Sequence, residues 1–362
     1  MSVCHDVRGE SPNCLSHCSQ AKMGLQPFPD KLYVITAISN PMRFVTRYEL
    51  YRAFEKRVAD AGAELITIEA AFGDRPYEIT SAANPNHIQV RSNSEIWLKE
   101  NLINLAISRL PEEARYIAWV DADLQFTRPD WAQETIQQLQ HHDFVQMFSH
   151  IINLGPSQEF LGDGISFMHG WRSGHGLISG EGVIADATFY RPSGEIADDG
   201  YSSCVSSQSS SNWAGAPGGA WAATREALDA VGGLIDWVPI GSADYYMARA
   251  LFGLLDLSID GGGSYYNPSY IKMLVTWQRM AMAELKNNVG HVNGTIFHHW
   301  HGKTIRRGYE SRWKILAKHD FDPMTDLKRN SYGVLELAGN KPQLRDDLRS
   351  YFFQRSEDGI DV

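Results

Sequence analysis

The chain has 362 residues, of which 43% are hydrophobic, and it carries a formal net charge of −10. This length and composition support a sizeable core in one large domain or two small ones, and the acidic balance excludes wholesale electrostatic binding to nucleic acid, although a local basic groove stays open. The apolar runs fall well short of the roughly 20 residues that a bilayer span needs, so we expect no membrane segment.

The N-terminal residues 1–27 carry no pattern of a folded element. They are polar, and they lack both hydrophobic periodicity and the basic start and apolar stretch of a secretory signal. We therefore expect a flexible leader on a cytoplasmic protein. Three of the four cysteines, Cys4, Cys14 and Cys18, lie in this leader near two histidines. A zinc site is the alternative there, even though the spacing matches no common zinc pattern.

After the leader, strand patterns alternate with helix patterns. Compact apolar and β-branched runs predict strands at residues 31–38, 64–69, 116–120 and 143–148. Hydrophobic periodicity predicts helices through residues 48–58, 95–110 and 131–140. Such alternation is typical of an α/β fold with a mostly parallel sheet flanked by helices.

The chain divides into two halves by composition. Residues 28–150 have the pattern of a nucleotide-binding half-fold, whereas residues 155–217 are rich in Gly and Ser and are expected to form functional loops. A strand at 218–224 and helices at 225–231 and 242–252 follow. The second half is expected to end near residue 330, with residues 331–362 as a C-terminal extension.

Two aspartates follow the buried strand at 116–120, in the segment Trp119-Val-Asp-Ala-Asp-Leu-Gln-Phe126. Period-two geometry would put Asp121 and Asp123 on one side of an extended chain. Ligands bind outside the carboxyl ends of parallel strands, and a hard divalent ion that bridges two phosphates takes one or two carboxylates from the protein. The pair is therefore a candidate metal site, although an Asp-x-Asp in a solvated turn has the same sequence.

Three segments, in order, resemble a known family. They are Trp97-Leu-Lys-Glu-Asn-Leu-Ile-Asn104 with Val120-Asp-Ala-Asp123, then the Gly218-Gly strand and helix that lead to Gly241-Ser-Ala-Asp-Tyr-Tyr-Met247, and finally His298-His-Trp-His-Gly302. In these motifs the chain resembles the metal-dependent GT-A glycosyltransferases, and in motif order the β-1,4-galactosyltransferase type. The resemblance implies a GT-A domain at 28–330, with a nucleotide-sugar half at 28–150 and an acceptor half at 151–330.

The resemblance also implies roles for individual residues. Asp123 would ligate a metal, and Asp121 would contact the donor ribose or a metal-bound water. Asp244 would be the catalytic base, unless it only stabilises a helix start. Ala243 stands where the family usually has Glu, which puts some acceptor contacts in doubt.

The histidine motif is expected to complete the metal site. His299 and His301 would share one face of an extended segment, and one of the two is expected to complete the metal site. Nitrogen together with carboxylate ligands suits Mn²⁺ and tolerates Mg²⁺. A histidine-rich strand end that packs for structural reasons is the alternative.

Donor contacts are expected at the crevice beyond the strand ends and at the basic run after the histidines. Several of these side chains could equally be ordinary surface residues. The candidates are Ala37, Asn40, Arg43, Glu69, Lys99, Asn104, Asp121, Gly219 and Arg306.

The sequence thus predicts a glycosyltransferase that moves a sugar from a nucleotide sugar, expected to be a UDP sugar, to an acceptor hydroxyl. A base at Asp244 implies inversion, and a retaining route stays open if Asp244 is structural. The acceptor could be a glycan, a small molecule, a protein or a modified DNA base, as for a phage enzyme. A non-catalytic binding module of the same fold is the alternative. A sugar-nucleotide pyrophosphorylase is disfavoured because the first strand is not followed by a Gly-rich basic loop.

Overall fold

The computed structural model describes residues 30–173, 178–179, 182–183, 215–255, 266–309 and 311–360. The expected leader lies outside the described residues, as does most of the Gly- and Ser-rich stretch after residue 173. Residues 31–362 form one compact unit, to which the following description applies.

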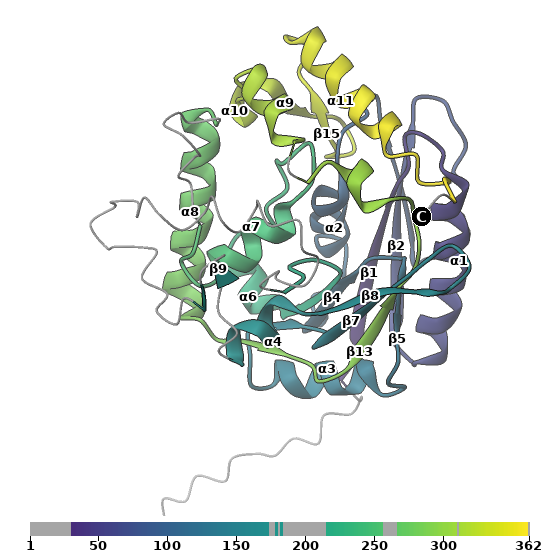
Figure 1. The fold of residues 1–362 in the computed structure, drawn as a ribbon, viewed down its shortest axis with the longest axis vertical. Helices are drawn as coiled ribbons and strands as arrows, with labels where there is room; N and C mark the ends of the chain where they lie inside the picture. Colours follow the sequence, from purple (N-terminus) through teal and green to yellow (C-terminus); the bar gives the residue numbers. More distant parts are fainter. Residues whose placement is uncertain are drawn as a thin grey trace, which may run out of the picture. The chain divides into compact units, whose positions relative to one another are not determined.

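A seven-stranded sheet in the order β12-β6-β11-β4-β1-β2-β3 forms the centre of this unit (Figure 1). All of its strands run in one direction except β11, which is antiparallel to both β4 and β6. The predicted α/β class with a mostly parallel sheet is confirmed. The strands are β1 (Leu32–Ser39), β2 (Glu64–Phe72), β3 (His87–Ser92), β4 (Tyr116–Val120), β6 (Phe144–Gln146), β11 (Ala220–Thr224) and β12 (Val289–His291).

The reversed strand β11 places a glycine pair beside the first aspartate. Ala220 pairs with Val120 in the antiparallel ladder, so the residues just before β11 meet those just after β4. The backbone N–H of Asp121 donates to the carbonyl of Gly219 at 2.9 Å. Gly219 has a φ of 95°, a conformation that favours glycine.

Helices cover both faces of the main sheet. Residues of β1 alternate between the faces: Val34 packs in one core cluster with α1 and α3, and Ile35 in the other with α2, α6, α7 and α8. The helices are α1 (Val45–Asp60), α2 (Lys99–Ile107), α3 (Trp131–Leu139), α6 (Arg225–Ala230), α7 (Ala243–Ala250) and α8 (Pro268–Leu285). The long helix α8 begins at an Asn267 cap followed by proline, the usual chemistry of a helix start.

A smaller four-stranded sheet, in the order β5-β13-β7-β8, carries the histidine motif. Its strands are β5 (Leu124–Phe126), β7 (His150–Leu154), β8 (Phe160–Ile165) and β13 (Thr295–His298). The first part of the stretch that we expected to be irregular, residues 155–217, is therefore ordered. It contains β8, α4 (Phe167–Arg172) and the short strands β9 (Ile178–Ser179) and β10 (Gly182–Val183).

The chain after residue 330 packs into the same core and does not extend away from it. Val334, Leu335, Leu344 and Leu348 are buried in the main cluster. The expected C-terminal extension is thus part of the folded unit, because its apolar residues are buried in the same core cluster as residues of α2 and α8. The last elements are η1 (Thr304–Arg307), α9 (Trp313–Lys318), α10 (Pro323–Asp326), β14 (Leu327–Arg329), β15 (Leu335–Leu337) and α11 (Pro342–Gln354).

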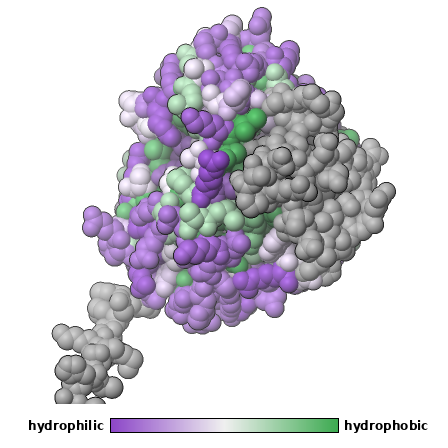
Figure 2. All heavy atoms as spheres, turned by 90° about the vertical axis from the view of Figure 1, so that its left-hand side faces the viewer, coloured by the Kyte–Doolittle hydropathy of each residue, from purple (hydrophilic) through white to green (hydrophobic). Residues whose placement is uncertain are grey.

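The described residues on the face drawn in Figure 2 form a largely polar surface. On the face drawn in Figure 2, hydrophilic residues predominate and apolar residues occupy smaller areas between them. None of the helices in the described ranges has both the length and the apolar character that a membrane span requires.

Candidate functional site

Strand register brings the second aspartate and the histidine motif together. β13 pairs antiparallel with β5, and His298 lies opposite Leu124, the residue after Asp123. The backbone N–H of His299 donates to the carbonyl of Asp123 at 2.8 Å. Two segments about 175 residues apart in sequence therefore meet at the end of β4.

Three side-chain atoms converge at this point. Oδ2 of Asp123 lies 3.1 Å from Nε2 of His301 and 3.8 Å from Nε2 of His298. The two histidine nitrogens are 3.1 Å apart. Among the described residues, this is the only group of three or more His, Cys, Asp or Glu side chains whose ligand atoms all lie within 4.8 Å of one another.

The contact of Nδ1 of His298 determines which of its two ring nitrogens carries the hydrogen. Nδ1 of His298 lies 2.9 Å from Oδ1 of Asn153, a residue of β7 that faces it across the ladder. Because an amide oxygen only accepts, Nδ1 carries the hydrogen and Nε2 presents a lone pair to the group. A ligating histidine is usually oriented by such a bond to its other nitrogen.

Burial and a nearby cation keep both histidines neutral. Burial and the Arg307 guanidinium lower the pKa of His298 to about 3. The same two causes, with His298 itself, hold the pKa of His301 well below its usual value. Burial raises the pKa of Asp123, against the effect of Arg307. The nitrogens thus stay deprotonated at neutral pH, the state in which histidine binds metals.

The group fits a divalent ion. Neighbouring ligands of an octahedral ion at about 2.1 Å lie about 3.0 Å apart, close to the two separations of 3.1 Å. In addition, Oδ1 of Asp123 is buried and has no hydrogen-bond partner. An unpaired buried carboxylate oxygen is costly, and a bound cation would relieve that cost.

His299 and Asp121, both expected at the metal, lie outside this group. The ring of His299 contacts the side chains of Gln158 and Gln125, at 3.0 and 3.2 Å. The prediction that His299 and His301 share a face was wrong because β13 ends at His298 and the chain turns at Gly302, which has a φ of 87°. It is therefore His298, and not His299, that lies beside His301.

Asp121 faces a different partner from Asp123. Its carboxylate pairs with the ammonium of Lys99, on α2, at 2.5 Å. The two aspartates do not lie on one extended strand: the N–H of Leu124 donates to the carbonyl of Asp121, so the chain turns between them. Burial raises the pKa of Asp121, whereas Lys99 opposes that rise.

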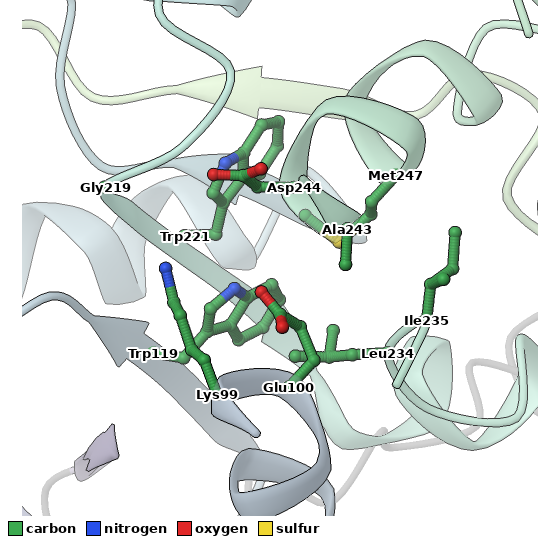
Figure 3. Close-up of a pocket in the computed structure, with 10 residues that line it drawn as sticks. All are labelled: Lys99, Glu100, Trp119, Gly219, Trp221, Leu234, Ile235, Ala243, Asp244 and Met247. Atoms are coloured by element: carbon green, nitrogen blue, oxygen red, sulfur yellow. The ribbon is translucent and has the colours of Figure 1, made fainter. Parts of the chain in front are cut away.

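A small pocket adjoins the Lys99–Asp121 pair (Figure 3). Lys99 and Glu100 reach into it from α2, and Asp244 faces them from the start of α7. The walls are Trp119, Gly219, Trp221, Leu234, Ile235, Ala243 and Met247. Burial would lower the pKa of Lys99, yet that pKa is raised because three carboxylates, led by Asp121, surround the ammonium.

Backbone geometry fixes Asp244 in the pocket. Gly241 and Ser242 have φ values of 89° and 75°, which turn the chain sharply into α7. On the opposite side, Gly218 leaves room for the Asp244 carboxylate, since a Cβ at position 218 would overlap its Oδ2. Asp244 also accepts a bond from the N–H of Tyr245 at 2.8 Å, so the candidate base lies at a helix start and in a pocket at once.

The expected donor contacts on the first two strands lie apart from this pocket and have partners within the chain. Glu69 is buried, and its carboxylate accepts from the backbone N–H groups of residues 78–80 and from the Thr80 hydroxyl. Asn40 bonds twice to the backbone of Phe44, at 2.8 and 3.0 Å. Arg43 pairs with Glu78 at 3.1 Å. Ala37 lies near the end of β1, half-buried.

The remaining candidates differ in their surroundings. Asn104 makes two bonds of 2.9 Å to the backbone of Leu234, so it holds the loop that forms one wall of the pocket. Gly219 lines the pocket itself. Arg306 lies on η1, and its guanidinium lies next to Gly359.

Glu100, whose carboxylate lines the pocket, was not identified from the sequence. Glu100 accepts a bond from the indole N–H of Trp97 at 2.9 Å. Burial, and to a lesser degree Asp244, raise the pKa of Glu100 to about 7, against the effect of Lys99. The only signal in the sequence was an acidic residue next to Lys99 in a helix with apolar neighbours.

We predict that Glu100→Gln makes the protein more stable relative to the wild type as pH rises. An acid with a raised folded-state pKa holds its proton more tightly when folded, so its contribution to the unfolding free energy falls between pH 4.5 and about 7. The rise from 4.5 to about 7 corresponds to roughly 3 kcal/mol. Urea unfolding at pH 5 and pH 8 measures the unfolding free energy of the variant and of the wild type, with Glu112→Gln, at an exposed position, as the control. A difference between Glu100→Gln and the wild type that does not change with pH would contradict the prediction.

No protein-family model matches the chain, and no curated protein matches its sequence. Solved structures match distantly. The catalytic domain of Drosophila β1,4-galactosyltransferase 7 in complex with xylobiose has a TM-score of 0.33 and 11% identity, over 87% of this chain and 98% of that one. A mutant of that enzyme in complex with manganese, UDP-Gal and xylobiose has a TM-score of 0.33 and 10% identity, over 87% and 97% of the two chains.

A proposed nucleotide-diphospho-sugar transferase from Desulfovibrio desulfuricans G20 has a TM-score of 0.29 and 10% identity, over 90% of this chain and 97% of that one. Similarity at this level aligns no individual residues, so the function has to be argued from the geometry of this chain.

Proposed function

We propose that the chain is a metal-dependent glycosyltransferase that transfers a hexose from a nucleotide sugar, with a UDP sugar as the expected donor, to an acceptor hydroxyl. The observation that carries the proposal is the convergence of Asp123, His298 and His301 at the end of β4. Next to it lies a pocket with an aspartate suited to act as a base, Asp244. The order of the sequence motifs supports the same activity.

The three converging atoms would hold the ion. Two imidazole nitrogens and one carboxylate oxygen suit Mn²⁺ and tolerate Mg²⁺. When bound, the ion supplies positive charge that stabilises the diphosphate leaving group. Arg307, the cation that acts most strongly on Asp123, adds charge of the same sign at that place.

The pocket residues would handle the acceptor. The acceptor hydroxyl gives its proton to Asp244 as its oxygen bonds to the anomeric carbon. The bond from that carbon to the diphosphate oxygen breaks, and its electron pair leaves with the diphosphate. Attack from the side opposite the leaving group inverts the configuration. Lys99 pairs with Asp121 at 2.5 Å, so we assign the role of proton acceptor to Asp244, which faces the pocket from the start of α7.

We predict that His301→Ala weakens Mn²⁺ binding at least tenfold, whereas His299→Ala leaves it unchanged. The ring of His301 lies 3.1 Å from Asp123, but the ring of His299 contacts two glutamines instead. Titration of Mn²⁺ followed by electron paramagnetic resonance measures both affinities. Equal losses in the two variants would show that the converging group is not the metal site.

A second prediction concerns turnover. With Mn²⁺ present, we expect slow hydrolysis of one member of a panel of nucleotide sugars that includes UDP-galactose. Asp244→Asn should lower its kcat about 10²- to 10⁴-fold with little change in KM, because a base acts on the attacking oxygen and not on donor binding. The exposed Asp163→Asn is the matched control.

Outcomes of that experiment separate the alternatives. Binding of a nucleotide sugar without any turnover would favour a non-catalytic module, and no binding at all would reject the proposal. Once the donor is known, candidate acceptors of each class, namely glycans, small molecules, proteins and modified DNA bases, can be compared by transfer from that donor.

A further inference from the structure

The last described residues of the chain contact the loop that carries His301. Trp300 lies between His299 and His301 in the sequence, and its indole N–H donates to the carbonyl of Gly359 at 2.7 Å. Gly302 approaches the same segment so closely that a Cβ there would lie 3.0 Å from Cα of Glu357 and 3.1 Å from the carbonyl of Ser356. Residues 355–359, here termed the C-terminal segment, thus touch both sides of His301.

The C-terminal segment is itself held firmly. The carboxylate of Glu357, 1% exposed, pairs with Arg47 on α1 and with Arg355, with one bond of 2.7 Å to Arg47 and one of 2.6 Å to Arg355. The carboxylate of Asp358 accepts from the N–H groups of Val45 and Thr46, at 3.0 and 2.8 Å. These N–H groups belong to the first turn of α1 and have no partner within the helix, and a carboxylate is favoured at such a helix start. Figure 1 shows the yellow end of the chain beside α1.

Arg47 extends the connection to the central sheet. Besides Glu357, its guanidinium donates to the carbonyl of Ser39, the last residue of β1, at 2.7 Å. The C-terminal segment therefore joins the end of β1 and the start of α1 to the histidine loop. A buried and doubly paired carboxylate such as Glu357 is expensive to displace, so this connection is rigid.

We propose that the C-terminal segment is a positioning element of the metal site, which places His301 through its contacts with Trp300 and Gly302. This inference rests on the metal site proposed above. The loop from His298 to Gly302 leaves β13, and none of the described strands pairs with it at His301, so contacts from neighbouring segments help to place the ring. Groups that orient a metal ligand from behind typically change metal affinity by about 10- to 100-fold when they are removed.

The test compares two tryptophans with the same kind of bond. Trp300→Phe removes the indole N–H that bonds to Gly359, and the control Trp313→Phe removes a bond of 2.8 Å to the carbonyl of Tyr309, outside the loop from His298 to Gly302. Mn²⁺ affinity is measured in the full chain by electron paramagnetic resonance, and thermal unfolding without metal checks the fold. We expect about tenfold weaker Mn²⁺ binding for Trp300→Phe and wild-type binding for Trp313→Phe.

Gly302→Ala provides a second variant that leaves Trp300 intact. Its methyl group would push against the backbone at Glu357 and should weaken Mn²⁺ binding in the same direction. Wild-type affinity in both Trp300→Phe and Gly302→Ala would overturn this inference and leave the metal site standing. Absence of Mn²⁺ binding in the wild type would instead overturn the metal site, and this inference with it.

Discussion

Buried negative charge at the end of β4 is the constraint on which the rest of the site depends. Burial raises the pKa of both Asp121 and Asp123, which means that the protein loses hydration energy by keeping either one ionised. The cost of burying the negative charge is offset differently at the two aspartates. Asp121 has an ammonium group of the chain itself, Lys99, at 2.5 Å. Asp123 has two neutral imidazoles and one oxygen without a partner.

Under the proposed function, this difference gives the two aspartates of the Asp-x-Asp motif separate tasks. The ammonium of Lys99 already neutralises Asp121, so the proposal gives Asp121 contacts with the donor or the task of holding Lys99 in place. Asp123 needs a cation, and the lone pair of His298, fixed by Asn153, points to the same place. Asp121 and Asp123 have different partners because the chain turns between them, which directs the first side chain to α2 and the second to β13.

Much of the fold was predictable because local patterns agree with the final packing. The runs that became β1, β2 and β4 are apolar on both sides, as buried parallel strands require. The reversed direction of β11 was not predictable, since a short apolar strand pattern does not show whether the strand runs parallel or antiparallel to its neighbours. The helix expected at 95–110 starts only at Lys99, and the N–H of Trp97 before it donates to the carbonyl of Pro239.

The site was predictable in kind but not in detail. Asp123, His301 and Asp244 were chosen from motifs, and the structure brings the first two together and puts the third in a pocket. The choice of His299 over His298 depended on where β13 ends, which is decided by its pairing with β5 and β7. Glu69 was expected to contact the donor at the crevice beyond the strand ends, but residues 78–80 bond to its carboxylate. Contacts of that kind depend on distant segments, which single-sequence patterns do not encode.

The most direct test of the account is a crystal structure of the protein grown with MnCl₂ and UDP, with anomalous diffraction used to locate manganese. The account predicts one strong anomalous peak in contact with Oδ2 of Asp123 and Nε2 of both His298 and His301, with Asp121 still paired to Lys99. A peak bound by Asp121 or His299 in place of these atoms, or no peak near Asp123, would contradict it.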